Sequence, residues 1–270
     1  MTLKTLPLSD PYGSVAYRAA GQGEPVVLIH GVGMQSAAWG PQIKALSQTH
    51  RVIALDMPGH GGSSALPQGS TLTDYVAWLH AVLVAADVDR VSLAGHSMGA
   101  LIAGGFAASH PGMVSRVALL NGVFRRDAPM RAAVEARAAA IRAGRLDTET
   151  PLQRWFGDSD LEASARRQVA QWLNAVDPVG YATAYTAFAG GDSTYAERFG
   201  AISCPLLAIT GDNDPNSTPA MARAMADAAP QGRAVIVEGH RHMVNLTAPE
   251  LINAELRRWL ETDCTLEETS

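Results

Sequence analysis

A serine that could act as a nucleophile lies in the segment Gly95-His96-Ser97-Met98-Gly99. The apolar run Val91–Gly95 before it favours a buried strand, and Met98–His110 after it has the apolar spacing of a helix. A Gly-x-Ser-x-Gly segment in this position typically forms a sharp strand-to-helix turn that exposes the serine hydroxyl at a helix N-terminus. We therefore interpret Ser97 as the nucleophile of an acyl-transfer reaction.

A serine hydroxyl needs a base to take its proton, and the base needs an orienting carboxylate. After a turn of this kind, the carboxylate and then the histidine follow the serine along the chain. His110 lies at the far end of the helix that Ser97 begins, about 20 Å away at 1.5 Å per residue, so it cannot be the base. His240 and His242 both follow the apolar run Ala234–Val237 and remain candidates.

Two carboxylates follow the apolar run Leu206–Gly211, at Asp212 and Asp214. The orienting carboxylate would accept the Nδ1–H bond of the histidine, fix its tautomer and stabilise the imidazolium. The other aspartate is expected to hold the loop locally, as aspartate does in turns.

Hydrolysis through a tetrahedral intermediate also needs donors for the developing oxyanion. One donor is expected from the backbone N–H of Met98, directly after the nucleophile. We expect the second from Val32, in the glycine-containing turn His30–Met34 that follows the apolar run Val26–His30. His30 precedes the serine in the chain and is expected to brace this turn rather than to act as a base or metal ligand.

Short apolar runs that alternate with helix-like segments must position these side chains. The runs are Leu3–Leu6, Val15–Tyr17, Val26–His30, Val52–Leu55, Val91–Gly95, Val117–Asn121, Leu206–Gly211 and Ala234–Val237. Helical spacing is found in Ser36–Leu46, Leu72–Ala86, Met98–His110, Pro219–Ala229 and Leu246–Leu260. The alternation predicts an α/β fold with a mostly parallel eight-stranded sheet flanked by helices, with an antiparallel N-terminal edge.

One stretch interrupts the alternation, because residues 125–196 are helix-like and contain no convincing strand. We expect a helical insertion there, on a core formed by residues 1–124 and 197–270. Its aromatic residues could pack on the core or line a pocket: Trp155, Phe156, Trp172, Tyr181, Tyr185 and Phe188. Gly31, Trp155, Tyr185 and Phe188 are the candidates for substrate contact. One of its arginines could meet a substrate carboxylate: Arg125, Arg126, Arg131, Arg137, Arg142, Arg145, Arg154, Arg166 or Arg167.

The motifs together resemble those of the α/β-hydrolase fold superfamily. They are His30–Gly33, Leu55–Ser63, Gly95–Gly99, Gly211-x-x-Asp214 and the late histidine. The resemblance favours Asp214 over Asp212, and His242 over His240, because of the segments that follow each. It implies a Ser97-His242-Asp214 triad, an acyl-enzyme intermediate, no cofactor, no metal and a helical cap over the site. Within the superfamily, Asp177–Ala182 followed by Ala187 is similar to 3-oxoadipate enol-lactonases and related small-ester hydrolases.

The expected reaction is therefore hydrolysis of a small carboxylic ester or lactone. A serine at position 97 argues against the dehalogenase and epoxide hydrolase relatives, which use an aspartate. Hydrolysis of a carbon–carbon or amide bond with the same triad remains an alternative, as does perhydrolase chemistry. A segment Met243–Asn245 without tryptophan makes the carbon–carbon alternative weaker. A non-catalytic binding protein on the same fold is a remote alternative.

Composition points to a small-molecule substrate. The chain has 270 residues, a formal net charge of -5 and no tract of Lys or Arg that could follow a phosphate backbone, so nucleic acid is not an expected partner. No signal peptide or membrane span is expected, and two cysteines, Cys204 and Cys264, are too few for a disulfide framework. These observations favour a cytoplasmic protein.

Overall fold

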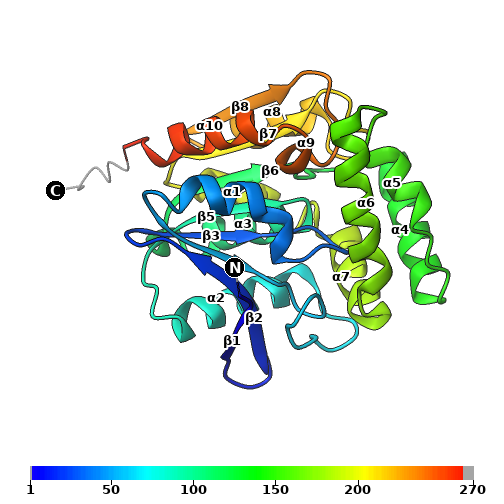
Figure 1. Cartoon of the computed structure of the whole chain (residues 1–270), viewed down its shortest axis with the longest axis horizontal. Coiled ribbons are helices and arrows are strands. Elements are labelled where there is room, and N and C mark those ends of the chain that lie inside the picture. The colour runs from blue at the N-terminus through cyan, green and yellow to red at the C-terminus, as the bar shows by residue number, and fades with distance from the viewer. Residues whose placement is uncertain (1, 264–270) are drawn as a thin grey trace.

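A single mixed sheet forms the centre of the molecule in the computed structural model, which describes residues 2–263 (Figure 1). Its strands are β1 (Lys4–Pro7), β2 (Ser14–Ala20), β3 (Pro25–Ile29), β4 (Arg51–Leu55), β5 (Val91–His96), β6 (Val114–Leu120), β7 (Leu206–Gly211) and β8 (Gly232–Val237). The order across the sheet is β1-β2-β4-β3-β5-β6-β7-β8. Only the pairs β1–β2 and β2–β4 are antiparallel. The predicted mostly parallel eight-stranded sheet with an antiparallel N-terminal edge is confirmed.

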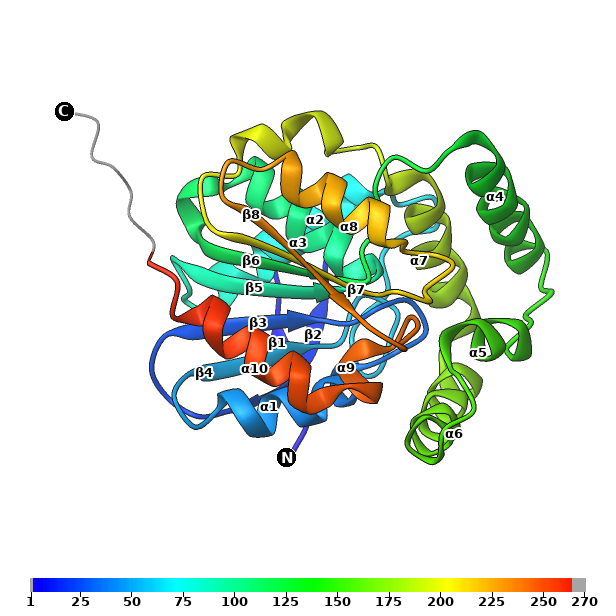
Figure 2. The same cartoon turned by 90° about the horizontal axis from the view of Figure 1, so that it is seen from above.

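Helices cover both faces of this sheet (Figure 2). Successive strand residues point to opposite faces, so Val27 packs in one core layer with Phe106, and Leu28 packs in the other with Leu256. The helices on the core are α1 (Gly40–Leu46), α2 (Leu72–Ala85), α3 (Met98–Ser109), α8 (Pro219–Asp227), α9 (Val244–Thr247) and α10 (Pro249–Leu260), with 3-10 turns η1 (Ser36–Trp39), η2 (Pro111–Met113) and η3 (Ala196–Ala201). Figure 2 shows α1 and α10 on one face, and α2, α3 and α8 on the other.

The last predicted helix, Leu246–Leu260, is wrong as a continuous element. The structure has two helices there, α9 and α10, which meet at Ala248 and Pro249. Proline has no backbone N–H and its ring obstructs the preceding turn, so the ladder of hydrogen bonds stops and restarts at this residue. The predicted helix Ser36–Leu46 is likewise divided into η1 and α1.

Four helices form the segment between β6 and η3. They are α4 (Ala128–Arg142), α5 (Glu149–Trp155), α6 (Asp160–Ala175) and α7 (Pro178–Gly191), and no residue between 125 and 196 belongs to a strand. The side chains of Asp127, Ser159 and Asp177 cap the first turns of α4, α6 and α7 by accepting backbone N–H bonds. This helical insertion lies beyond one edge of the sheet in Figure 2. The division into a core and a helical cap at residues 125–196 stays a prediction.

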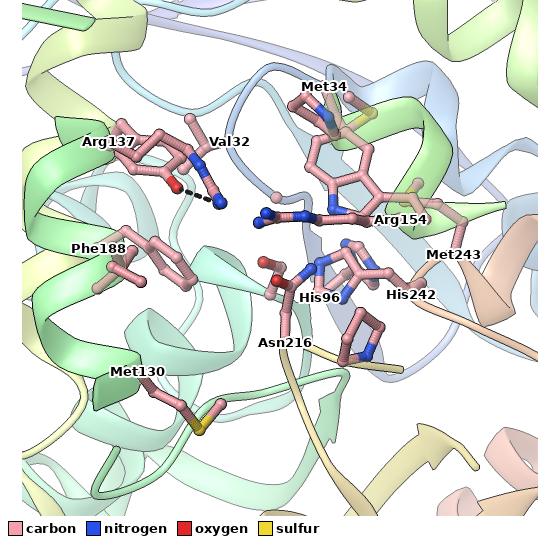
Figure 3. A pocket seen from close by; sticks show the side chains of 18 of the residues that line it. Val32, Met34, His96, Met130, Arg137, Arg154, Phe188, Asn216, His242 and Met243 are labelled. Carbon is pink, nitrogen blue, oxygen red and sulfur yellow. Dashed lines mark hydrogen bonds between the residues drawn. The ribbon is translucent and has the colours of Figure 1, made fainter. Parts of the chain in front are cut away.

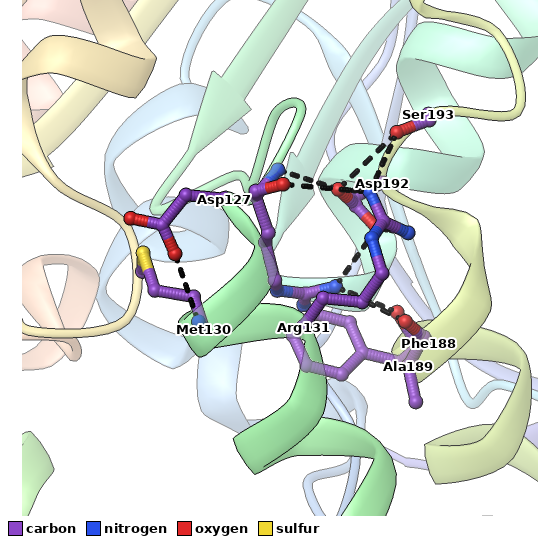
Figure 4. Close-up of polar contacts among 8 residues, drawn as sticks. Asp127, Met130, Arg131, Phe188, Ala189, Asp192 and Ser193 are labelled. Carbon is purple, nitrogen blue, oxygen red and sulfur yellow. Dashed lines mark hydrogen bonds and ion pairs between the residues drawn. The ribbon is translucent and has the colours of Figure 1, made fainter.

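A buried carboxylate joins the two ends of the insertion (Figure 4). The Asp192 side chain is fully buried and accepts the backbone N–H of Arg126 at 2.6 Å. It also pairs with the guanidinium groups of Arg126 at 3.2 Å and Arg131 at 3.1 Å. A buried carboxylate is tolerated when hydrogen-bonded cations surround it. The contact therefore links residues that are 66 positions apart in the chain.

The structure locates one of the two cysteines and shows the length and apolarity of each described helix. Cys204 is buried, and Cys264 lies outside the described residues. Within residues 2–263, no helix combines the length and apolarity that crossing a membrane requires.

Candidate active site

The candidate catalytic residues follow the carboxyl ends of parallel strands. Ser97 follows β5, Asp214 follows β7 and His242 follows β8, while Val32 follows β3. The carboxyl ends of parallel strands meet at one edge of a sheet, where open α/β folds form their ligand sites. The helical insertion lies at this same edge (Figure 2).

Ser97 occupies a strained turn that only small neighbours permit. Its φ of 55° lies in the left-handed region, which non-glycine residues rarely adopt. A Cβ atom on Gly95 would overlap the carbonyl oxygen of Gly99, and one on Gly99 would overlap that of Ile29. The backbone N–H of Ser97 donates to Leu120 O at 2.9 Å, which fixes the turn against β6. The two glycines thus allow the close packing that the motif predicts.

The structure brings His242 and Asp214 together. His242 Nδ1 lies 2.7 Å from Asp214 Oδ2, and the two side chains are 4% and 0% exposed. An ionised carboxylate can only accept, so Nδ1 carries the proton in this contact. Nε2 of the neutral ring is then the nitrogen that can accept a proton. His242 and Ser97 line the same cavity.

His240 and Asp212 have other partners. His240 Nδ1 lies 2.9 Å from Thr247 Oγ1, and Asp212 Oδ1 accepts the backbone N–H of Gly239 at 2.8 Å. Asp212 therefore holds the loop locally, as expected for an aspartate in a turn. Neither residue lines the cavity that contains Ser97.

Asn121, at the end of β6, is a site residue that sequence reasoning missed. Its Nδ2 donates to Asp214 Oδ2 at 2.8 Å, on the oxygen that also accepts from His242. Burial alone would raise the pKa of Asp214, but the charge of His242 and the hydrogen bonds from His242, Asn121 and Asn216 lower it. The carboxylate is therefore held in the ionised form that orients the imidazole.

Two buried histidines hold the turn that contains Val32. His30 Nδ1 donates to Gly31 O at 2.7 Å and its Nε2 accepts from the backbone N–H of Met57 at 2.9 Å. His60 Nε2 accepts from the backbone N–H of Gly33 at 2.9 Å. Each ring uses one nitrogen as an acceptor, so each must be neutral. Burial lowers the pKa of His30 well below its usual range and that of His60 to about 4.

The backbone N–H groups of Val32 and Met98 are available at the site. Met98 is the first residue of α3, where N–H groups have no intrahelical acceptor. Among the hydrogen bonds of residues 2–263, neither N–H is a donor. A substrate oxygen could therefore accept a hydrogen bond from each of these two N–H groups.

A cavity of about 160 Å³ contains Ser97 and His242 (Figure 3). All four residues proposed for substrate contact lie in its wall: Gly31, Trp155, Tyr185 and Phe188. Their contact with a substrate stays a prediction. A cavity of this size accommodates a small molecule rather than a polymer or a long acyl chain.

Three arginines from the insertion line the cavity, and none of the described lining residues carries a carboxylate. Arg126 is already paired with Asp192. Among residues 2–263, the one hydrogen bond of the Arg137 guanidinium is from Nη1 to the hydroxyl oxygen of Tyr185, at 3.1 Å. Arg154 has no hydrogen bond or ion pair with any of residues 2–263. Figure 3 shows the guanidinium groups of Arg137 and Arg154 directed toward one another across the cavity, so the cavity has an excess of positive charge.

Comparison with known proteins gives a consistent result. The model of the alpha/beta hydrolase family matches residues 26–255. The chain is 50% identical to an (E)-2-((N-methylformamido)methylene)succinate hydrolase of Acinetobacter baylyi, over 97% of this chain and 99% of that protein.

Solved structures agree. An enol-lactonase from Burkholderia xenovorans superposes with a TM-score of 0.84 at 27% identity, covering 93% of this chain and 100% of that one. A hydrolase from Pseudomonas aeruginosa gives a TM-score of 0.87 at 25% identity, covering 97% and 99%. Matched over most of its length by the family model and by a hydrolase at 50% identity, the chain is a hydrolase that belongs to the alpha/beta hydrolase family.

Proposed function

We propose that the protein is a serine hydrolase that cleaves an acyl carbon–nitrogen bond in a small substrate with two carboxylates. The observation that carries this proposal is the pair of guanidinium groups, Arg137 and Arg154, that face each other in a cavity whose described lining residues include no carboxylate. Two positive charges in one cavity repel each other, and an anion bound between them offsets this repulsion. The name of the Acinetobacter relative describes a succinate, which has two carboxylates, bearing a formamido group, which is an amide.

The proposed reaction proceeds by acylation of Ser97 and then hydrolysis of the acyl-enzyme. Ser97 Oγ attacks the acyl carbon while its proton moves to Nε2 of His242, and Asp214 stabilises the imidazolium through Nδ1. The N–H groups of Val32 and Met98 bind the oxyanion of the tetrahedral intermediate. The carbon–nitrogen bond breaks as His242 returns the proton to the leaving nitrogen. A water molecule deprotonated by His242 then cleaves the acyl-enzyme ester and restores Ser97.

The arginines would set specificity rather than perform the chemistry. Arg137 is held by Tyr185, so its fork is oriented before substrate arrives. Arg154 is exposed and is screened by solvent, so its contribution is smaller. Arg126 is neutralised by Asp192 and is expected to shape the wall, where its guanidinium lies 4.5 Å above the Phe188 ring.

A substrate comparison tests the proposal. We expect kcat/KM for (E)-2-((N-methylformamido)methylene)succinate to exceed that for N-methyl-N-vinylformamide, which has the same vinyl formamide but no carboxylate, by about a hundredfold or more. Arg137→Met should lower kcat/KM for the dicarboxylate by about tenfold or more. Arg142→Met is the matched control, because Arg142 is on the same helix but binds Thr186 outside the cavity. Equal rates for the two substrates, or equal effects of the two variants, would contradict the proposal.

Ester or lactone hydrolysis is the second candidate. The same machinery cleaves esters, and the 27% identity with an enol-lactonase supports it. Amide and methyl ester derivatives of one dicarboxylate scaffold separate the two, since an enzyme limited to esters and lactones would leave the amide uncleaved. Labelling of Ser97 by a fluorophosphonate, and its loss in Ser97→Ala, tests the nucleophile in either case.

A further inference from the structure

The insertion reaches the imidazole of His242 itself. Trp155, the last residue of α5, stacks on this ring with centroids 5.6 Å apart and planes inclined by 27°. The other neighbours of the ring come from the core. Asp214 binds its Nδ1, and His96 lies 5.0 Å away edge-on and binds the backbone carbonyl of His242 at 2.8 Å. The indole is thus a direct contact between the insertion and the ring of His242.

The Arg241 side chain anchors the end of α5, the helix that carries Trp155. Arg241 Nη1 donates to Gln153 O and to Phe156 O, each at 2.8 Å. The last carbonyl groups of a helix have no intrahelical donor and form the negative end of its dipole, so a guanidinium is favoured there. The two residues between these acceptors are Arg154 and Trp155.

We propose that Arg241 is a positioning residue that holds Trp155 against His242 and Arg154 in the cavity. The proposal rests on the function proposed above for His242 and Arg154. When His242 takes the proton of Ser97, its ring becomes a cation next to the electron-rich face of the indole, which stabilises that charge. One contact thereby couples substrate binding by the insertion to proton transfer by the core.

Two measurements separate the two consequences. The rate of Ser97 labelling by a small neutral fluorophosphonate depends on the base but not on recognition of a carboxylate. The inhibition constant of succinate depends on the arginines but requires no proton transfer. We expect Trp155→Leu to slow labelling about tenfold and Arg154→Met to weaken succinate binding severalfold.

Arg241→Met should produce both defects. Arg241→Lys, which keeps the charge and part of the donor set, should restore part of each. In the Trp155→Leu background, Arg241→Met should slow labelling no further, because the contact through which it acts is gone. Arg233→Met is the matched control, since Arg233 pairs with Glu255 on the surface, away from the cavity. Its effect on both quantities should be negligible.

The outcomes are distinguishable. Additive effects of Arg241→Met and Trp155→Leu, or an Arg241→Met protein that behaves like Arg233→Met, would overturn the positioning role. Wild-type protein that is not labelled at Ser97, or that does not bind succinate, would instead overturn the proposed function. Thermal melting of each variant, with assays performed well below every Tm, separates a loss of fold from a loss of positioning.

Discussion

Acidification from pH 8 to pH 5 is expected to destabilise the fold through histidines that must remain neutral. His60 donates from Nδ1 to Pro58 O and accepts at Nε2 from the N–H of Gly33. A proton on Nε2 would point at that N–H, so the folded state resists protonation. His96 is also fully enclosed, and burial lowers its pKa to about 3, while burial lowers that of His60 to about 4.

The size of the effect follows from proton linkage. Histidine in an unfolded chain has a pKa of about 6.5, so at pH 5 each ring is almost fully protonated when unfolded and mostly neutral when folded. The unfolded state then binds more protons, and stability falls as the pH falls from about 6.5 toward the folded pKa. Each ring contributes about 2 kcal/mol by pH 5, and the two together about 4 kcal/mol. His30, whose pKa is also lowered by burial, acts in the same direction.

Urea unfolding followed by circular dichroism at pH 8, 6.5 and 5 measures this loss. In His60→Gln the difference between pH 8 and pH 5 should shrink by about 2 kcal/mol, whatever the stability of the variant at pH 8. His50→Gln is the control, because the ring of His50 forms an exposed hydrogen bond with Thr49. Equal wild-type stability at pH 8 and pH 5, or an unchanged difference in His60→Gln, would refute the assignment of neutral buried rings.

Further predictions concern the catalytic residues. Ser97→Ala and His242→Ala should each lower kcat, measured by steady-state kinetics, by several orders of magnitude with little change in Tm. His240→Ala should change kcat only mildly. A larger loss of kcat in His240→Ala than in His242→Ala would mean that the base is misassigned. Asp214→Asn should lower kcat by about 10⁴, because the histidine loses the partner that fixes its tautomer. Asn121→Ala should lower kcat by about tenfold to a hundredfold, since it removes a hydrogen bond to a buried carboxylate; a change in KM alone would contradict this role.

Much of the fold could be predicted because local pattern and tertiary structure agree. The apolar run Val91–Gly95, for example, lies in a fully buried strand that pairs with β3 on one side and β6 on the other. The error at Pro249 arose from apolar spacing that continues across the proline, while the hydrogen-bond ladder cannot. Periodicity reports which face of an element is buried, and it does not report where the backbone breaks.

The site was predicted as far as motifs extend. Chain order and family pattern favoured His242 and Asp214, which the structure brings together. Asn121 was missed because an asparagine at a strand end has many ordinary roles, and its partner is 93 residues away. For a similar reason, the sequence could not show which arginines of the insertion line the cavity. Whether a long side chain on the insertion enters the cavity, as Arg137 does, depends on how its helix packs.

The carboxylate of Asp192 has a consequence for how this protein can change. Because it ties the start of the insertion to its end, the chain leaves the core and returns to it through one narrow neck of fixed geometry. The cost of closing a chain segment grows only slowly with its length. Helices between the two ends can therefore be lengthened, shortened or exchanged while the neck, and the strand ends that carry Ser97 and Asp214, stay where they are. Most of the insertion can therefore change the selectivity without moving the catalytic residues of the core, whereas a change in α5, which carries Trp155, would also reach His242.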